Sequence, residues 1–271
     1  MKRLFISRLV ESNPGDYWST PKHYFDEFKN DDWVDVFEFH KKDLTSYDKI
    51  IIGGGGLLFN PNFDKPLSLL QHPKYVEKVL FWGAGINSPF HKNSTQKEID
   101  ETSEKFPHKL KVFNKSQLNL RDKQNRYNFV PCASCLHKVF DTNEEVKRKY
   151  LIIRHTKVDS FRDPLFNDIH KIYSIDNTIE NVIKEIKKSE IIISQSYHGA
   201  YWAALCNKKV IVYRPWSTKF LYFNFPLKTL SKTNKKQFLN EDILTSTGDK
   251  YLNECRKKNL ELYEYCSSNN T

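Results

Sequence analysis

The residues best suited to chemistry lie between positions 190 and 206. An apolar run typical of a strand ends at Ser194, and both Ser194 and Ser196 are candidates for the cap of a following helix. His198 and Gly199 then open a segment of small and apolar residues. An imidazole with an unperturbed pKa of about 6.5 suits a general acid or base. We therefore expect His198 to be catalytic, although a lone histidine is more often structural.

Cationic residues follow the neighbouring strand-like runs. One run ends in a loop that carries Arg214, Ser217 and Lys219, and Arg154 closes an earlier run. In an open parallel α/β sheet the carboxyl ends of the strands meet at one edge, where such sheets bind ligands. One imidazole and several cations at that edge predict a site for an anion.

Three glycine-containing loops follow strand-like runs in the first half of the chain. Glycine lets the backbone approach a ligand closely, and helix amides can hold an anion, although tight structural turns are the alternative. The loops lack both the dinucleotide fingerprint and the Gly-Lys-Ser/Thr ending of a P-loop, so neither a nicotinamide nor a flavin cofactor is expected. The candidate positions are Asn13, Gly15, Asp16, Gly54, Gly55, Gly56, Gly83, Gly85 and Asn87.

Composition limits the partners. The formal net charge of +10 over 271 residues favours anionic partners, although a lysine-rich proteome is an equal explanation. The lysine runs are not interleaved with aromatic residues, so nucleic acid is not expected. No apolar stretch reaches about 20 residues and the N-terminus is not that of a signal peptide, which predicts a cytoplasmic protein. Cys132 and Cys135 lack a second ligand pair, so no metal is expected and buried thiols are the preferred interpretation.

Alternating strand-like and helix-like segments predict an α/β fold with parallel sheets. The expected strands are Leu4–Ser7, Val34–Phe39, Lys49–Ile52, Lys78–Trp82, Leu110–Phe113, Gln117–Leu120, Tyr150–Arg154, Lys171–Ile175, Ile191–Ser194 and Lys209–Tyr213. The expected helices are Thr20–Lys29, Pro66–Leu70, Thr95–Lys105, Thr178–Lys188, Tyr197–Cys206 and a closing helix from Asp249 to about Cys266. We predict two doubly wound, Rossmann-like domains, 1–140 and 141–248, that face each other across a cleft, with 249–271 as the closing helix and tail.

The order of these motifs resembles that of the polysaccharide pyruvyl transferase family over about residues 4 to 220. The motifs are the Asn-x-Gly-Asp loop, Gly-Gly-Gly-Gly-Leu-Leu, Trp-Gly-Ala-Gly-Ile, Arg121-Asp122, Val-Pro-Cys-Ala-Ser-Cys-Leu-His and Ser-Tyr-His-Gly-Ala. The resemblance implies a GT-B-like fold and transfer of the enolpyruvyl group of phosphoenolpyruvate to a sugar hydroxyl, giving a pyruvate ketal and phosphate. Phosphoenolpyruvate is then a co-substrate, and no bound cofactor is implied. Ser196 stands where the family often has an arginine that is expected to hold the donor. The sequence therefore leaves open whether another residue holds the same donor or the donor itself differs.

In the resulting hypothesis His198 transfers a proton to the donor and Asp16 accepts the proton of the sugar hydroxyl. Arg154, Arg214 and Lys219 hold the donor's charges. Arg121 is a further candidate, although Arg121-Asp122 could equally be a surface ion pair. Ser194, Ser196, Gly199 and Ser217 are expected beside the donor, and Tyr17, Trp18, Trp82 and Asn87 beside the acceptor, with core packing as the alternative for Trp82.

Two other functions stay open from the sequence. A GT-B glycosyltransferase would use a nucleotide sugar, but it needs a carboxylate to grip the ribose and none is evident near Arg214 to Lys219. A non-catalytic carbohydrate-binding protein would have kept the fold and lost the donor site. A lipid-linked acceptor would bring the protein to the inner face of the membrane.

Overall fold

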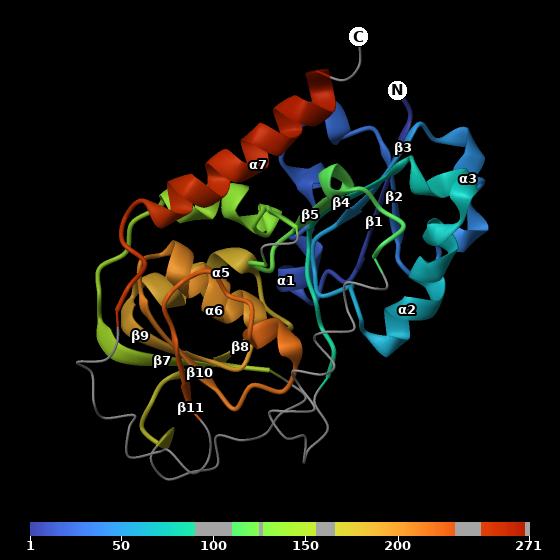
Figure 1. Ribbon diagram of the computed structural model, residues 1–271. Coiled ribbons are helices and arrows are strands. Elements are labelled where there is room, and N and C mark those ends of the chain that lie inside the picture. The colour runs from blue at the N-terminus through green and yellow to red at the C-terminus, as the bar shows by residue number, and fades with distance from the viewer. Residues whose placement is uncertain (90–109, 125–126, 156–165, 231–244, 269–271) are drawn as a thin grey trace.

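The fold contains two parallel sheets. Figure 1 shows the computed structural model, which describes residues 1–89, 110–124, 127–155, 166–230 and 245–268. The first sheet has the order β2-β1-β3-β4-β5-β6 and the second the order β11-β10-β9-β7-β8. The first comprises β1 (Arg3–Ser7), β2 (Asp32–Asp35), β3 (Lys49–Gly53), β4 (Val79–Ala84), β5 (Leu118–Leu120) and β6 (Asn128–Phe129). The second comprises β7 (Arg148–Arg154), β8 (Lys171–Tyr173), β9 (Ser189–Ser194), β10 (Lys209–Tyr213) and β11 (Lys228–Leu230). The predicted α/β class is confirmed.

Each sheet reverses its strand order once. In the first sheet β2 and β3 lie on opposite sides of β1, and in the second β8 and β9 lie on opposite sides of β7. Loops that leave two adjacent strands in opposite directions leave a crevice beyond the carboxyl ends of those strands. The loops after β1, β3, β7 and β9 are therefore the places where each sheet can hold a ligand.

The central strands are apolar because both of their faces are covered. Ile50, Ile51 and Ile52 of β3 and Ile191, Ile192 and Ile193 of β9 are all at most 1% exposed. The helices are α1 (Pro14–Tyr17), α2 (Pro61–Ser68), α3 (Pro73–Val76), α5 (Ile179–Lys187), α6 (Tyr197–Leu205) and α7 (Tyr251–Ser268). Every residue of α6 is buried, which explains why its sequence shows no polar face.

Several predicted elements differ from those observed. The predicted helix Thr20–Lys29 is two 3₁₀ turns, Pro21–His23 and Asp26–Phe28, because Phe25 and Phe28 turn inward against Trp82. The predicted strand Leu110–Phe113 is a turn. Its two end residues are buried in the hydrophobic core that contains Ile50 and Ile52. The two-residue β6 and the three-residue β11 were not predicted. The predicted helix Thr95–Lys105 lies outside the described residues.

The strand predicted at Val34–Phe39 ends instead at Asp35. The carboxylate of Asp35 accepts hydrogen bonds from the backbone N–H groups of Leu9 and Phe37 and from the guanidinium of Arg8. These bonds turn the chain away from the sheet and leave Phe37 40% exposed. The early end of this strand therefore creates an exposed aromatic side chain at the carboxyl edge of the sheet.

Helix α7 joins the two halves, as its path across both in Figure 1 shows. Leu262 packs with the core that contains Trp82, and Cys255 packs with the core around α6. The indole N–H of Trp82 donates to Asn259 Oδ1 at 2.8 Å, entirely within the interior. The closing helix predicted from Asp249 is thus present and packs against both sheets. The predicted boundaries of two domains and the GT-B-like arrangement stay predictions.

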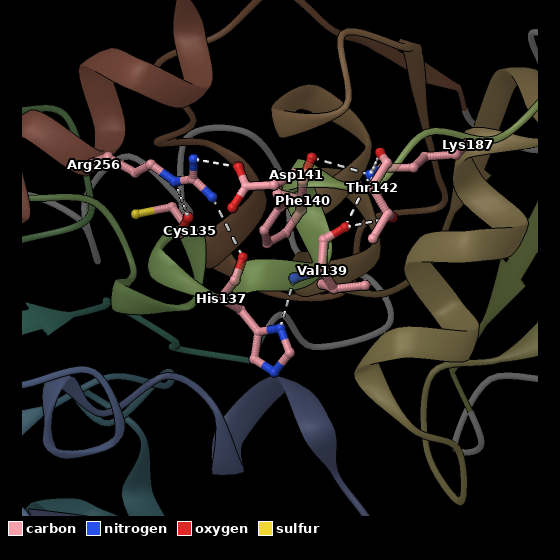
Figure 2. Close-up of polar contacts among 8 residues, drawn as sticks. All are labelled: Cys135, His137, Val139, Phe140, Asp141, Thr142, Lys187 and Arg256. Atoms are coloured by element: carbon pink, nitrogen blue, oxygen red, sulfur yellow. Dashed lines mark hydrogen bonds and ion pairs between the residues drawn. The ribbon is translucent and has the colours of Figure 1, made fainter.

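The segment that crosses from the first sheet to the second is held by two cations (Figure 2). Arg256 of α7 donates to the carbonyl oxygen of Cys135 at 2.9 Å and pairs with Asp141 at 2.7 Å. From the opposite side, Lys187 of α5 donates to the carbonyl oxygens of Val139 at 2.9 Å and Phe140 at 3.0 Å. The crossing segment is therefore fixed to α5 and to α7 rather than being a loose linker.

Candidate active site

A cleft of about 590 Å³ lies between the carboxyl edges of the two sheets. Its lining from the first sheet comes from the loops after β1, β2, β3 and β4 and from Arg121 after β5. Its lining from the second comes from the loops after β7, β8, β9 and β10. The strand-order reversals of both sheets thus face the same space.

Hydrogen bonds between the two halves close the cleft on two sides. The backbone N–H of Asp176 donates to the carbonyl oxygen of Ser12 at 2.7 Å. On the other side, Thr218 N–H donates to Ser88 O at 2.9 Å, and Ser217 Oγ donates to Asn87 Oδ1 at 2.7 Å. Ser217 therefore links the two halves. The acceptor of its hydrogen bond is the amide oxygen of Asn87, a residue that also lines the cleft.

His198 sits at the first turn of α6 and lines the cleft, with only 7% of its surface exposed. Ser196 caps this helix by accepting a hydrogen bond from Gly199 N at 3.4 Å, as predicted. A Cβ atom on Gly15 would lie 2.3 Å from His198 Nδ1, so α1 of the first half touches the ring only because residue 15 is glycine. Burial, together with the positive charges of Arg121 and Lys219, holds the pKa of His198 well below 6.5. The pKa of His198 therefore lies below the value that an imidazole has in water.

Arg121 is the most buried cation among the described residues that line the cleft. Its guanidinium lies 3.6 Å from the ring centre of Tyr197, and the residue is 3% exposed. Its Nε and Nη1 atoms are buried without a hydrogen-bond partner in the described part of the chain. Residue 85 must be glycine here, since a Cβ atom would lie 2.0 Å from Arg121 Nε. The alternative of a surface ion pair with Asp122 is wrong, because both side chains are buried and Asp122 instead accepts from Ile86 N at 2.6 Å.

Asp16 is the sole carboxylate in the described lining of the cleft. It follows the short helix start at Pro14 and accepts a hydrogen bond from Asn13 Nδ2 at 2.7 Å. Burial raises the pKa of Asp16 above 3.8, while the charges of Lys219 and Arg121 oppose that rise. The first half therefore contributes a buried carboxyl group with a raised pKa to a cleft that otherwise holds cations.

Lys219 lines the cleft from the second half, but the two predicted arginines do not. The Nζ atom of Lys219 lies 3.8 Å from the ring centre of Trp216. Arg154 lies over the ring of Tyr173 at 5.1 Å, and neither it nor Arg214 is among the residues that line the cleft. Donor binding by Arg154 and Arg214 stays a prediction.

Most of the remaining positions that were predicted to lie beside a ligand instead contact other residues of the protein. Ser194 Oγ donates to the carbonyl oxygen of Ser196 at 2.8 Å, which shapes the turn before α6. Gly54 and Gly83 have φ values of 71° and 64°, in the left-handed region that favours glycine. Gly54 packs on Ser19, Gly83 on Pro131, Gly55 on Asp16 and Gly56 on Asn87, and of these glycines Gly56 lines the cleft.

The aromatic residues that line the cleft from the first half differ from those predicted to contact the acceptor. Trp82 is fully buried in the core, so its predicted contact with a sugar is wrong and the alternative of core packing is confirmed. Tyr17 and Trp18 pack on His23 and do not line the cleft. Phe37 and Phe63 line it instead, with ring centres 5.3 Å apart.

Arg8 completes this aromatic rim. Its guanidinium lies 4.8 Å from the ring centre of Phe37 and 5.8 Å from that of Phe63, and it pairs with Asp35 at 2.7 Å. The sequence signal that could have found Arg8 is its position directly after β1. Phe63 lies in α2, and nothing in the sequence alone places it opposite Phe37.

One side chain of the crossing segment, that of Cys132, lies beside His198. Cys132 is fully buried, and its Sγ lies 3.6 Å from His198 Nε2. Cys135 is also buried and is contacted by Asn259 Nδ2 at 3.4 Å. The segment that contains the two cysteines therefore packs beside His198 of α6. The spacing of the cysteines in the sequence did not predict this contact.

Comparison with known proteins gives one family. The family model described as polysaccharide pyruvyl transferase matches residues 8–217. No curated protein sequence matches the chain. A solved structure of a functionally uncharacterised protein from Klebsiella pneumoniae subsp. pneumoniae NTUH-K2044 is similar at 14% identity, with a TM-score of 0.44 over 79% of this chain and 83% of that one. In the described part of the chain, no helix is both long and apolar enough to span a membrane.

Proposed function

The chain belongs to the polysaccharide pyruvyl transferase family and is a transferase, and we propose that it moves the enolpyruvyl group of phosphoenolpyruvate to sugar hydroxyls. The product is a cyclic pyruvate ketal on a surface polysaccharide or its precursor, with release of phosphate. Phosphoenolpyruvate acts as a co-substrate, and the proposal uses no cofactor.

The observation that carries the donor assignment is the unpartnered guanidinium of Arg121. A buried cation without a hydrogen-bond partner is unfavourable unless a ligand supplies one. Arginine matches carboxylates and phosphates because its N–H groups form a planar fork. Arg121 and Lys219 together supply the charge for a compact donor with a carboxylate and a phosphate. Ser196 stands where the family often has an arginine that is expected to hold the donor. In this proposal Arg121 supplies the positive charge that the family arginine would provide.

Proton transfer is divided between the two halves of the cleft in this proposal. Asp16, the carboxyl group that lines the cleft, takes up a proton and gives it to the methylene carbon of the donor, and the neighbouring carbon gains oxocarbenium character. The first sugar hydroxyl attacks that carbon and returns a proton to Asp16. The C–O bond to phosphate breaks with its electron pair, the second hydroxyl closes the ketal, and its proton leaves on the phosphate.

His198 stays a catalytic residue in this proposal, but its role changes. The sequence-based hypothesis made His198 the acid that protonates carbon. The low pKa of His198 leaves its ring neutral near pH 7, so that role passes to Asp16. The neutral imidazole instead contacts the anionic donor, beside Arg121 and Lys219.

The acceptor side of the cleft is the rim formed by Arg8, Phe37 and Phe63. Aromatic rings can cover the apolar face of a sugar, and the side chains of Asn60 and Asn62 line the same end of the cleft. This composition supports a glycan acceptor rather than nucleic acid. A lipid-linked acceptor would hold the protein at the cytoplasmic face of a membrane, and its positive net charge of +10 suits such a surface.

The rival donor is a nucleotide sugar. Its ribose needs a carboxylate on the second half, and the described cleft residues after β7, β8, β9 and β10 include none. A non-catalytic carbohydrate-binding protein would not need Arg121 at this position, because a neutral sugar carries no charge that could compensate the positive charge of a buried guanidinium. Both observations favour the phosphoenolpyruvate-dependent transferase.

The test is thermal unfolding with phosphoenolpyruvate and, separately, with a panel of nucleotide sugars. A ligand that binds only the native state raises the melting temperature by mass action. We expect phosphoenolpyruvate to stabilise the wild type, Arg121→Gln to lose that shift and Lys250→Gln, at an exposed position outside the cleft, to keep it. A shift with a nucleotide sugar alone would replace this proposal by the glycosyltransferase. Sugar binding without phosphate release in any acceptor assay would favour the binding protein.

A further inference from the structure

A chain of buried polar contacts leads from α6 to the ring of His198. The indole N–H of Trp202 donates to Ser134 Oγ at 3.0 Å. Ser134 Oγ lies 3.2 Å from Cys132 Sγ, which in turn lies 3.6 Å from His198 Nε2. Cys132, Ser134 and Trp202 are all completely buried. The relay therefore has no access to solvent protons except through His198.

The direction of each hydrogen bond follows from the donors available. Indole N–H can only donate, so Ser134 Oγ is an acceptor in its contact with Trp202. The other polar contact of the Ser134 hydroxyl is Cys132 Sγ, so that sulfur is the acceptor available to the serine hydrogen. The thiol hydrogen of Cys132 is then left for His198 Nε2. Burial raises the pKa of the Cys132 thiol, which keeps that hydrogen in place near pH 7.

The two nitrogens of His198 consequently differ. Nε2 accepts from the thiol, and a neutral imidazole that accepts at one nitrogen carries its proton on the other. Nδ1 has no hydrogen-bond partner among the described residues, and the backbone of Gly15 packs beside it. Because Nε2 faces the buried Cys132 and His198 lines the cleft, Nδ1 is the nitrogen left for a ligand.

We propose that Cys132, supported by Ser134 and Trp202, holds His198 in the neutral Nδ1–H tautomer, so that the ring donates this hydrogen bond to an anionic oxygen of the donor. The proposal rests on the proposed function for the identity of that donor. Cys132 is a positioning residue, since it acts through His198 and does not reach the cleft itself. His198 is then an electrophilic hydrogen-bond donor and not an imidazolium acid.

The surroundings of the ring favour this neutral form. Arg121 after β5 and Lys219 after β10 both oppose a positive charge on His198, and no cause from an acidic group offsets them. An imidazolium would also present an Nε2–H to Cys132, which would leave the thiol hydrogen of Cys132 without an acceptor. A neutral N–H, by contrast, adds directly to the cations that bind the donor. The crossing segment that carries Cys132 and Ser134 is itself clamped by Arg256 and Lys187 (Figure 2).

The primary test is NMR of the ligand-free protein labelled with ¹⁵N-histidine. The two nitrogens of a neutral imidazole give well-separated shifts according to which one carries the proton. The signals of His198 among the nine histidines are assigned by comparison with His198→Gln. We expect a protonated Nδ1 and an unprotonated Nε2, unchanged when phosphoenolpyruvate is added. A protonated Nε2, or a doubly protonated ring with phosphoenolpyruvate, would overturn the proposal.

This measurement needs no activity, so it separates the tautomer from the proposed reaction. If the tautomer is as expected and phosphoenolpyruvate neither binds nor reacts, the proposed function fails and the relay stands.

The kinetic test uses substitutions at Cys132. Cys132→Ala removes the thiol donor, and we expect mixed tautomers in the spectrum with a fall of about 10-fold in kcat, the scale seen when a residue that orients a histidine is lost. Cys132→Ser keeps a hydroxyl donor and should restore the single tautomer and most of the turnover. Cys206→Ala, at the opposite end of α6, should change neither. A Cys132→Ala protein with the wild-type tautomer and turnover would refute the role of Cys132, and if this variant does not fold, Cys132→Ser and the wild-type spectrum still decide.

Discussion

The contact between Gly15 and His198 joins the two halves at the centre of the cleft, and it can be tested without any substrate. In the Gly15→Ala variant the new methyl group would lie 2.3 Å from Nδ1 and 2.7 Å from Cγ of the imidazole. Ordinary contacts of a Cβ atom begin at 3.4 Å, so the ring and α1 must separate by about 1 Å. His198 is buried and cannot simply rotate into solvent.

The magnitude follows from overpacking. Inserting a methyl group into a packed site costs about 1–3 kcal/mol. At about 3 °C per kcal/mol, the melting temperature of Gly15→Ala should fall by about 3–9 °C. Turnover should fall further, by about 100-fold, because a displacement of about 1 Å misaligns a catalytic group.

The decisive assay is a double-mutant cycle in urea unfolding. The His198→Ala background removes Nδ1 and Cγ, the two closest atoms that the methyl group would meet, and leaves only the contact with Cβ at 3.0 Å. Gly15→Ala should then be close to neutral, within about 1 kcal/mol, since alanine is a better helix former than glycine. The coupling energy between the two sites should therefore be about 1–3 kcal/mol. Equal destabilisation by Gly15→Ala in both backgrounds would refute the contact between the halves.

Two further predictions concern the buried surroundings of the cleft. Burial raises the pKa of Asp122 from 3.8 to about 7 against the opposing charge of Arg121, so the native state holds a proton that the unfolded state releases, and wild-type stability should fall as the pH rises from about 4 to 7. Asp122→Asn keeps an oxygen for the Ile86 N–H and should gain up to about 4 kcal/mol over the wild type across that range in urea unfolding, whereas a constant difference would contradict the raised pKa. Asn259→Ala leaves the indole N–H of Trp82 buried without a partner and should cost about 2–4 kcal/mol with no change in KM, while the exposed Asn253→Ala on the same helix should cost less than about 0.5 kcal/mol. Similar stability of the two asparagine variants would show that α7 does not lock the halves together.

The sequence by itself determined the class of the fold and the sites where strands end. Runs such as Ile50–Ile52 and Ile191–Ile193 are apolar throughout, and only strands buried on both faces need that composition. The helix cap at Ser196 and the position of His198 after β9 follow from local chemistry, which short segments encode. The order of motifs also indicated the family, because each motif occupies a strand end.

Only the tertiary structure decided which of these residues meet. Gly15 and His198 are 183 positions apart, and no local preference brings a glycine of the first half against an imidazole of the second. The same holds for Arg121, whose guanidinium lies against Tyr197 and not with its neighbour Asp122. Burial then moved the pKa values of these side chains away from those in water, since it raises the pKa of Asp16 and lowers that of His198. The sequence lists the groups that can carry charge, but their roles depend on the solvent and the charges that the fold leaves around them.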